Sequence, residues 1–158
     1  MKTEIILGTR DEWYEAVKLA RDVFKLCVEE DCTEAQKRNF LEGVESIYLF
    51  NQYLDGRYKL YLAYQGKFLV GMMTIMKDSH ISLLFVKKHC QKMGIGRELV
   101  DKCVEHAQGF GKKRITVNAA PISMGFYIRY GFDYDLKTIK QDDAYARPMY
   151  YQIKNGDL

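Results

Sequence analysis

The sequence predicts an α/β fold, a mixed and mostly antiparallel sheet flanked by helices, and two patterns lead to it. Residues 58–86 hold three apolar runs separated by short polar turns, the pattern of antiparallel strands joined by hairpins. Residues 81–117 then read as strand, glycine turn, amphipathic helix and strand. Because a helical crossover returns the chain in the same direction, the two strands of this second unit are expected to lie parallel.

The first segment is expected to hold one strand and one helix. Residues 3–7 form the strand. Thr9 and Glu12 have the spacing of a capping box at the start of the helix. The apolar residues of this helix recur at spacings of three and four, and they are Trp13, Val17, Ala20, Phe24 and Val28.

An acidic loop over residues 29–31 is expected next, followed by a second helix from Thr33 to about Tyr53. The apolar side of this helix is predicted to comprise Phe40, Val44, Ile47 and Tyr48. The strands after it are expected over residues 58–64 and 68–76, joined by a glycine turn.

The second half of the chain continues the α/β order. Strand 81–86 leads to a helix beginning at Ile95, and a further strand covers residues 114–117. Pro121 suits the first turn of the next helix, and Gly131 suits the left-handed position that ends it. Two closing strands are expected over residues 132–138 and 147–153, joined by a polar loop at residues 141–143.

Composition narrows the function classes. The chain has 158 residues, of which 47% are hydrophobic and 28% charged, so a single domain over residues 1–158 is expected. The net charge of +3 is too small to argue for nucleic-acid binding. The four cysteines lack zinc-ligand spacing, and no metal site is predicted. No signal peptide or membrane-length apolar run is found, so we expect a cytoplasmic protein with reduced thiols and no membrane association.

Gly94 and Gly96 stand between a strand and the first turn of a helix, where backbone N–H groups can bind a phosphate. The nucleoside-triphosphate loop motif is missing, and Leu99 occupies the third glycine position of the dinucleotide fingerprint. Taken alone, this stretch fits a phosphate-binding turn or a plain strand-to-helix turn without a ligand.

The pattern Gln91-x-x-Gly94-x-Gly96 resembles the acyl-CoA signature of the GNAT superfamily of N-acetyltransferases. A second stretch, residues 117–132, resembles the other half of that family's cofactor site, in which a strand ends in Asn and a short helix carries Phe-Tyr before Gly-Phe. The two stretches come in the family's order and favour the phosphate-binding interpretation. The chain resembles the small, single-domain bacterial type, which implies a GNAT-like fold and acetyl-CoA as the cofactor.

The resemblance implies a set of acetyl-CoA contacts. The backbone of Leu84, Phe85 and Val86 would meet the pantetheine arm where the two parallel strands separate, although the same residues can be plain core strand. Pyrophosphate would lie over the residues Gln91, Lys92, Met93, Gly94, Ile95, Gly96 and Arg97. The remaining cofactor contacts implied are Asn118, Ser123, Phe126 and Tyr130. Arg97 can instead be a solvated helix residue, and Asn118 a turn residue.

Tyr127 is the predicted catalytic residue, as general acid for the departing thiolate. A phenol with a pKa near 10 stays protonated at pH 7, and proton transfer to an alkyl thiolate is uphill by about 2 kcal/mol. Ser123, Tyr127 and Tyr130 share one helix face by their spacing. The alternative role for Tyr127 is a core aromatic. No general base can be placed.

The sequence predicts an acetyl-CoA-dependent N-acetyltransferase acting on a primary amine of an unidentified small-molecule, peptide or protein acceptor. The oligomeric state is left open between a monomer and a homodimer. One alternative is a catalytically silent CoA-binding regulatory domain, which would bind without turnover. Another is a structural or partner-binding domain in which both glycine turns only serve packing, and which would not bind acetyl-CoA.

Overall fold

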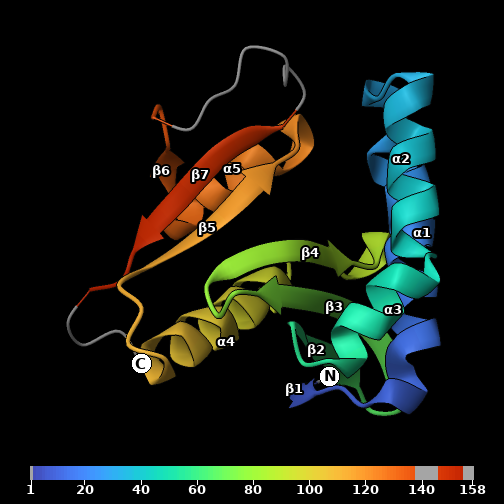
Figure 1. Cartoon of the computed structure of the whole chain (residues 1–158), viewed down its shortest axis with the longest axis horizontal. Helices are drawn as coiled ribbons and strands as arrows, with labels where there is room; N and C mark the ends of the chain where they lie inside the picture. Colours follow the sequence, from blue (N-terminus) through green and yellow to red (C-terminus); the bar gives the residue numbers. More distant parts are fainter. Residues whose placement is uncertain (1, 138–145, 155–158) are drawn as a thin grey trace.

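A computed structural model describes residues 2–137 and 146–154, and within them seven strands form one sheet in the order β1-β2-β3-β4-β5-β7-β6 (Figure 1). Neighbouring strands are antiparallel except for the β4–β5 pair. The strands are β1 (Thr3–Leu7), β2 (Tyr58–Gln65), β3 (Phe68–Met76), β4 (His80–Val86), β5 (Arg114–Ala119), β6 (Asp133–Tyr134) and β7 (Arg147–Gln152). The predicted mixed, mostly antiparallel α/β fold is therefore confirmed.

Helices cover both faces of the sheet. The helices are α1 (Trp13–Cys27), α2 (Glu34–Val44), α3 (Ile47–Leu54), α4 (Ile95–Gly109) and α5 (Pro121–Tyr130). Helix α1 packs on β3 and β4, whereas α4 packs on the sheet from β1 to β5 and α5 on β5 and β7. Short 3-10 turns lie at Arg10–Glu12, Glu29–Asp31 and Lys88–Cys90, so the predicted acidic loop is one such turn.

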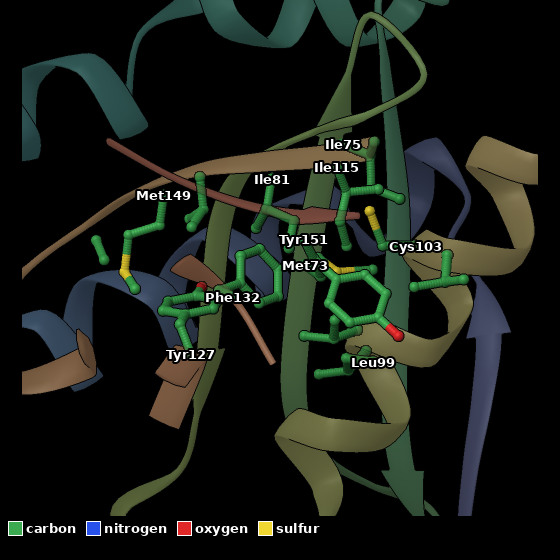
Figure 2. Packing of buried hydrophobic residues seen from close by; sticks show 14 of the residues in the cluster. Met73, Ile75, Ile81, Leu99, Cys103, Ile115, Tyr127, Phe132, Met149 and Tyr151 are labelled. Atoms are coloured by element: carbon green, nitrogen blue, oxygen red, sulfur yellow. The ribbon is translucent and has the colours of Figure 1, made fainter. Parts of the chain in front are cut away.

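Two buried clusters follow from this layering. The cluster on the α1 face draws on α1, α2, β2 and β3, with the Trp13 ring stacked on Tyr53 of α3 at 4.6 Å. The cluster on the α4 and α5 face extends across the sheet from β2 to β7, with Met73 and Ile75 on β3 and Met149 and Tyr151 on β7 (Figure 2). The first cluster thus lies on the part of the sheet that precedes β5, while the second joins this part to β5 and β7.

The predicted helix from Thr33 to Tyr53 is wrong in one respect, because two helices occupy this segment. The Ser46 backbone is extended, and its side-chain oxygen accepts a hydrogen bond from the Leu49 N–H at 3.1 Å, so Ser46 begins α3 as an N-cap. The change of axis leaves Ile47 and Tyr48 70% and 69% exposed. They do not share the buried side of Val44, as the continuous pattern predicted.

The closing strands differ from the prediction at one end. Strand β6 ends at Tyr134, because the Asp135 carboxylate accepts a hydrogen bond from the Lys137 N–H at 3.2 Å and turns the chain. The predicted polar loop at residues 141–143 and the strand end at Thr138 lie outside the described residues. Helix α5 begins at Pro121 and ends before Gly131, which has a φ of +123°, as predicted.

Candidate functional site

Strands β4 and β5 separate soon after they meet. They pair in parallel at His80 with Thr116 and at Ile81 with Val117. Beyond these pairs β4 runs on to Val86, hydrogen-bonded to β3 on its other side. The two arrows diverge clearly in Figure 1. The open side of β4 therefore presents backbone groups that no strand within the described residues pairs.

A bulge decides which of these backbone groups face the open side. Thr74 pairs with Leu83 but the next residue of β3 pairs with Ile81, so Ser82 is an extra residue in β4. The Lys87 N–H donates to a carbonyl of β3 at 2.8 Å. Because peptide groups alternate along a strand, those of Phe85 also point toward β3, whereas those of Leu84 and Val86 point away from it.

Helix α4 begins directly after this strand. Gly94 is its N-cap residue and has a φ of +87°, in the left-handed region that favours glycine. Lys92 also has a positive φ, +64°, and Met93 is exposed, so the predicted phosphate loop lies on the surface. Ile95 is buried, which limits its contribution to the backbone N–H. The first helical turn has free N–H groups, which can bind an anion.

Gly96 packs closely against a neighbouring helix. A Cβ atom placed on it would lie 3.0 Å from the ring of Phe126, which belongs to α5. The two predicted halves of the cofactor site are thus in contact through Gly96 and Phe126. The same closeness gives the glycine a packing role in addition to the predicted role beside a phosphate.

The side chains of Gln91 and Arg97 have protein partners. Gln91 Nε2 donates to the Val86 carbonyl at 3.0 Å and so holds the loop against the end of β4. The Arg97 guanidinium lies 5.0 Å from the centre of the Tyr130 ring. The Tyr130 hydroxyl donates to Asp101 at 2.6 Å, and burial together with this carboxylate raises the pKa of Tyr130.

Asp101 did not enter the sequence prediction. It stands four residues after Arg97 on α4, a helical spacing that places both side chains on one face. That spacing was the available signal, but only the structure shows that Tyr130 of α5 lies over this face.

Asn118 and Ser123 lie on the other side of the divergence. Asn118 is exposed, and it directly follows the last residue of β5 that pairs with β4. Ser123 lies in the first turn of α5, where its N–H donates to the Ala120 carbonyl at 2.9 Å. Both predicted residues therefore lie just beyond the last β4–β5 pair, on the side where the two strands have separated.

Tyr127 is 4% exposed and belongs to the cluster that spans the sheet. Its ring makes an edge contact with Phe132 at a centre distance of 5.0 Å (Figure 2) and another with Phe126 at 5.1 Å. Burial, with a smaller effect of Cys103, raises the pKa of the Tyr127 hydroxyl. Among the described residues only Thr74 has a fully enclosed side-chain oxygen or nitrogen without a hydrogen-bond partner. The Tyr127 hydroxyl, which bonds to no described residue, is therefore not fully enclosed.

The family profile described as Acetyltransferase (GNAT) domain matches residues 28–153 of the chain. The chain belongs to the GNAT acetyltransferase family. This match covers the chain from the residue after α1 to β7, while β1 and α1 lie before it.

Solved structures agree with the GNAT fold. The chain is similar to a GCN5-related N-acetyltransferase from Rhodopseudomonas palustris, with a TM-score of 0.82, 16% identity and 97% of each chain covered. It is also similar to the PaiA N-acetyltransferase from Thermoplasma acidophilum in complex with coenzyme A, with a TM-score of 0.79, 16% identity, and 97% of this chain and 100% of that one covered. A Bacillus subtilis acetyltransferase in complex with CoA gives a TM-score of 0.61, 24% identity and the same coverage. No curated protein matches the chain.

Other features of this GNAT chain lie away from the β4–β5 divergence. A cavity of about 510 Å³ lies between β1 and α4, where Glu98, Asp101 and Glu105 line it. Within residues 2–137 and 146–154, no group of three His, Cys, Asp or Glu side chains is placed to hold a metal ion. None of the helices in this part is long and apolar enough to cross a membrane. The four cysteines are free thiols.

Proposed function

We propose that the chain binds acetyl-CoA where β4 and β5 separate and transfers the acetyl group to a primary amine. The observation that carries this proposal is the divergence of the two strands after two residue pairs, with the N-terminus of α4 beside it, in a chain of the GNAT family. Two of the similar solved structures are complexes with coenzyme A, which supports acetyl-CoA as the ligand here. We further propose that residues 1–158 act as one catalytic domain.

The proposed cofactor seat uses mostly backbone groups. The N–H and C=O groups of Leu84 and the N–H group of Val86 are the polar groups of β4 available to the pantetheine amides, because the Val86 C=O already accepts from Gln91. The pyrophosphate would bind the N–H groups of the loop and first helical turn at residues 91–97, with Gly94 supplying the turn. Asn118 would add a side-chain contact from β5. Phe126, Ser123 and Tyr130 would border the ligand from α5.

The reaction places few demands on the protein. Acetyl-CoA supplies the thioester, whose C–S bond breaks as the neutral amine forms a C–N bond. A backbone N–H at the end of β4 would bind the carbonyl oxygen as negative charge develops on it. Tyr127 would give its hydroxyl proton to the departing sulfur, and the proton released from the amine would pass to water. The raised pKa of Tyr127 keeps this proton in place at neutral pH.

A thermal shift tests binding. At about 100 times its dissociation constant, acetyl-CoA should stabilise the folded state by about 2.7 kcal/mol, a melting shift of roughly 5–10 °C for a domain of this size. Adenosine alone should give much less. A folded sample with no shift at millimolar acetyl-CoA would contradict the proposal.

An acceptor screen separates catalysis from silent binding. Amines, aminoglycosides, polyamines and peptides are offered with acetyl-CoA, and free CoA is measured. Release that depends on one acceptor class supports the enzyme and identifies its substrate. The enclosed ring of Tyr127 is the observation that favours the alternative, a CoA-binding regulatory domain. Tight acetyl-CoA binding without turnover across the screen would support that alternative.

A further inference from the structure

The proposed site is divided between two parts of the sheet. The first part consists of β1 to β4 and carries the backbone of Leu84 and Val86. The second part consists of β5, β7 and β6 with α5, and it carries Asn118 and Tyr127. Two pairs of residues connect β4 to β5 along the ladder. The distance between the thioester-binding backbone and the proposed acid therefore depends on how the two parts are held together.

The two faces of the sheet differ in how they join these parts. On the α4 face, one buried cluster crosses the junction, with Ile81 on β4 and Val117 on β5. On the α1 face, the buried cluster contains no residue of the second part among the described residues. The second part can therefore pivot about the α4-face core unless another contact on the α1 face restrains it.

A side-chain hydrogen bond on the α1 face supplies such a contact. His80 Nδ1 lies 2.7 Å from Thr116 Oγ1, across the first β4–β5 pair. Because Ile81 and Val117 point into the α4-face core, their neighbours His80 and Thr116 point to the α1 face. Either neutral tautomer of His80 satisfies the bond, since the threonine hydroxyl can donate to the ring nitrogen or accept from it.

The start of β4 is itself fixed to the rest of the molecule. Lys77 and Asp78 form a tight turn with φ values of +53° and +64°, which residues other than glycine seldom adopt. The Asp78 carboxylate lies 3.4 Å from His106 Nε2 of α4. The next residue, Ser79, accepts the Thr116 N–H at 2.9 Å. His80 is thus presented to Thr116 from an anchored turn.

We propose that His80 and Thr116 are positioning residues, whose hydrogen bond sets the angle at which β4 and β5 separate and so places Tyr127 relative to the thioester. The functional part of this inference rests on the acetyltransferase activity proposed above. Loss of the bond leaves the α4-face core intact, so the chain folds while the two parts of the site move relative to each other. A displacement of about 1 Å at reacting groups can lower the rate by about 10²-fold, so a smaller one is expected to lower kcat measurably.

Three single substitutions isolate the bond. Thr116→Val keeps the shape and the β-branch but removes the hydroxyl, whereas Thr116→Ser keeps the hydroxyl. Thr74→Val is the matched control, because Thr74 is also a strand threonine, is 1% exposed, and has no hydrogen-bond partner within the described residues. Its hydroxyl can therefore be removed without breaking a contact.

Amide hydrogen exchange tests the bond without any ligand. In Thr116→Val, the amides of the β4–β5 ladder, including that of residue 116, should exchange about tenfold faster than in the wild type. Any change in global stability should appear equally in the β2–β3 amides, so their change is subtracted first. Thr116→Ser should restore slow exchange, and Thr74→Val should match the wild type. Equal change in both ladders would show a structural role alone and overturn the proposal.

Kinetics test the positioning. Thr116→Val should lower kcat roughly tenfold, while in a Tyr127→Phe background it should lower kcat less than about twofold, because the group it positions is already gone. Additive losses, or unchanged kcat despite local exchange, would overturn positioning. If the wild type does not bind acetyl-CoA by calorimetry, the proposed function fails instead, and the exchange result still decides whether the bond holds the strands.

Discussion

The side chain of Tyr127 combines an enclosed ring with a hydroxyl that no described residue bonds. The ring is fixed by Phe126 and Phe132, so the direction of the hydroxyl is set before any ligand arrives. Burial raises its pKa, which keeps the phenol protonated but makes proton transfer to a thiolate more uphill. A hydrogen bond that strengthens as charge develops on the sulfur has to offset this difference.

Replacing Tyr127 by Phe tests that role. The ring contacts remain and no hydrogen bond to a described residue is lost, so the melting temperature should change little. If the hydroxyl protonates the thiolate, kcat should fall by roughly 10²-fold or more with little change in acetyl-CoA affinity. Tyr134→Phe, at an exposed tyrosine of β6, is the control. Unchanged kcat in Tyr127→Phe would leave Tyr127 as a core residue.

At the scale of single residues, the sequence named candidate site residues but gave no information on the directions of their side chains. Gln91 was predicted beside the pyrophosphate, but its side chain bonds to the end of β4, and Arg97 stacks on Tyr130. These directions depend on neighbours distant in the sequence, so no local pattern encodes them. His80 and Thr116 carried no signal, because a lone histidine before an apolar strand gains meaning only from the strand beside it.

At the scale of elements, the sequence predicted types and order well and failed where one residue competes with a periodic pattern. The apolar spacing across residues 40–48 continues through Ser46, yet the capping bond of Ser46 divides the segment into α2 and α3. The run Leu84 to Val86 likewise gives no sign of the bulge at Ser82. That bulge determines which peptide groups face the open side of β4.

Removing the cap of α3 should weaken the fold measurably. Ser46→Ala deletes the oxygen that accepts the Leu49 N–H, so the free energy of unfolding should fall by about 1 kcal/mol. Urea unfolding measures this change. Ser46→Asp retains a capping oxygen and should remain close to the wild type. Equal stability of the alanine variant would mean that packing alone places the start of α3.

Contact between α4 and α5 at Gly96 gives a second prediction. In Gly96→Ala the new methyl group meets the Phe126 ring, and the cost of displacing this ring should outweigh the helix propensity that alanine gains, so stability should fall by about 1 kcal/mol and acetyl-CoA affinity several-fold. Gly109→Ala, at the end of the same helix where a Cβ meets nothing within 4 Å, should be neutral or stabilising. The Phe126→Leu change in the Gly96→Ala chain should recover stability. A Gly96→Ala variant as stable as wild type would exclude the overlap.

On the scale of the whole molecule, the sequence predicted that strands 81–86 and 114–117 lie parallel, which the structure confirms. The sequence did not predict that β4 and β5 pair at only two residue pairs within the described residues. Pairing length depends on contacts between segments that are far apart in the sequence, and such contacts are not visible in the periodicity of either strand. The feature that locates the proposed site is therefore a property of the assembled fold.

The junction of the two parts should make stability depend on pH. Burial and the nearby Lys77 lower the pKa of His80, so the unfolded chain takes up a proton near pH 6.5 that the folded chain refuses until lower pH. The free energy of unfolding should therefore be highest above about pH 6.5 and should decrease as the pH falls below this value. Urea unfolding at pH 7.5 and 5.5 should show a smaller decrease in His80→Gln than in wild type. His89→Gln, at an exposed histidine, should keep the wild-type decrease.

One buried cluster uses only elements that precede β5, whereas the other also needs α4, β5 and later elements, and this difference affects the chain during its synthesis. Residues up to Val86 can complete the α1-face cluster while the rest is still being translated, because its members all come from α1, α2, β2 and β3. The opposite face of the same strands, with Met73, Ile75 and Ile81, then stays bare until α4 and β5 emerge. At about 5–20 residues per second this exposure lasts on the order of seconds. A nascent chain halted at this length should bind chaperones, and one extended past β7 should release them.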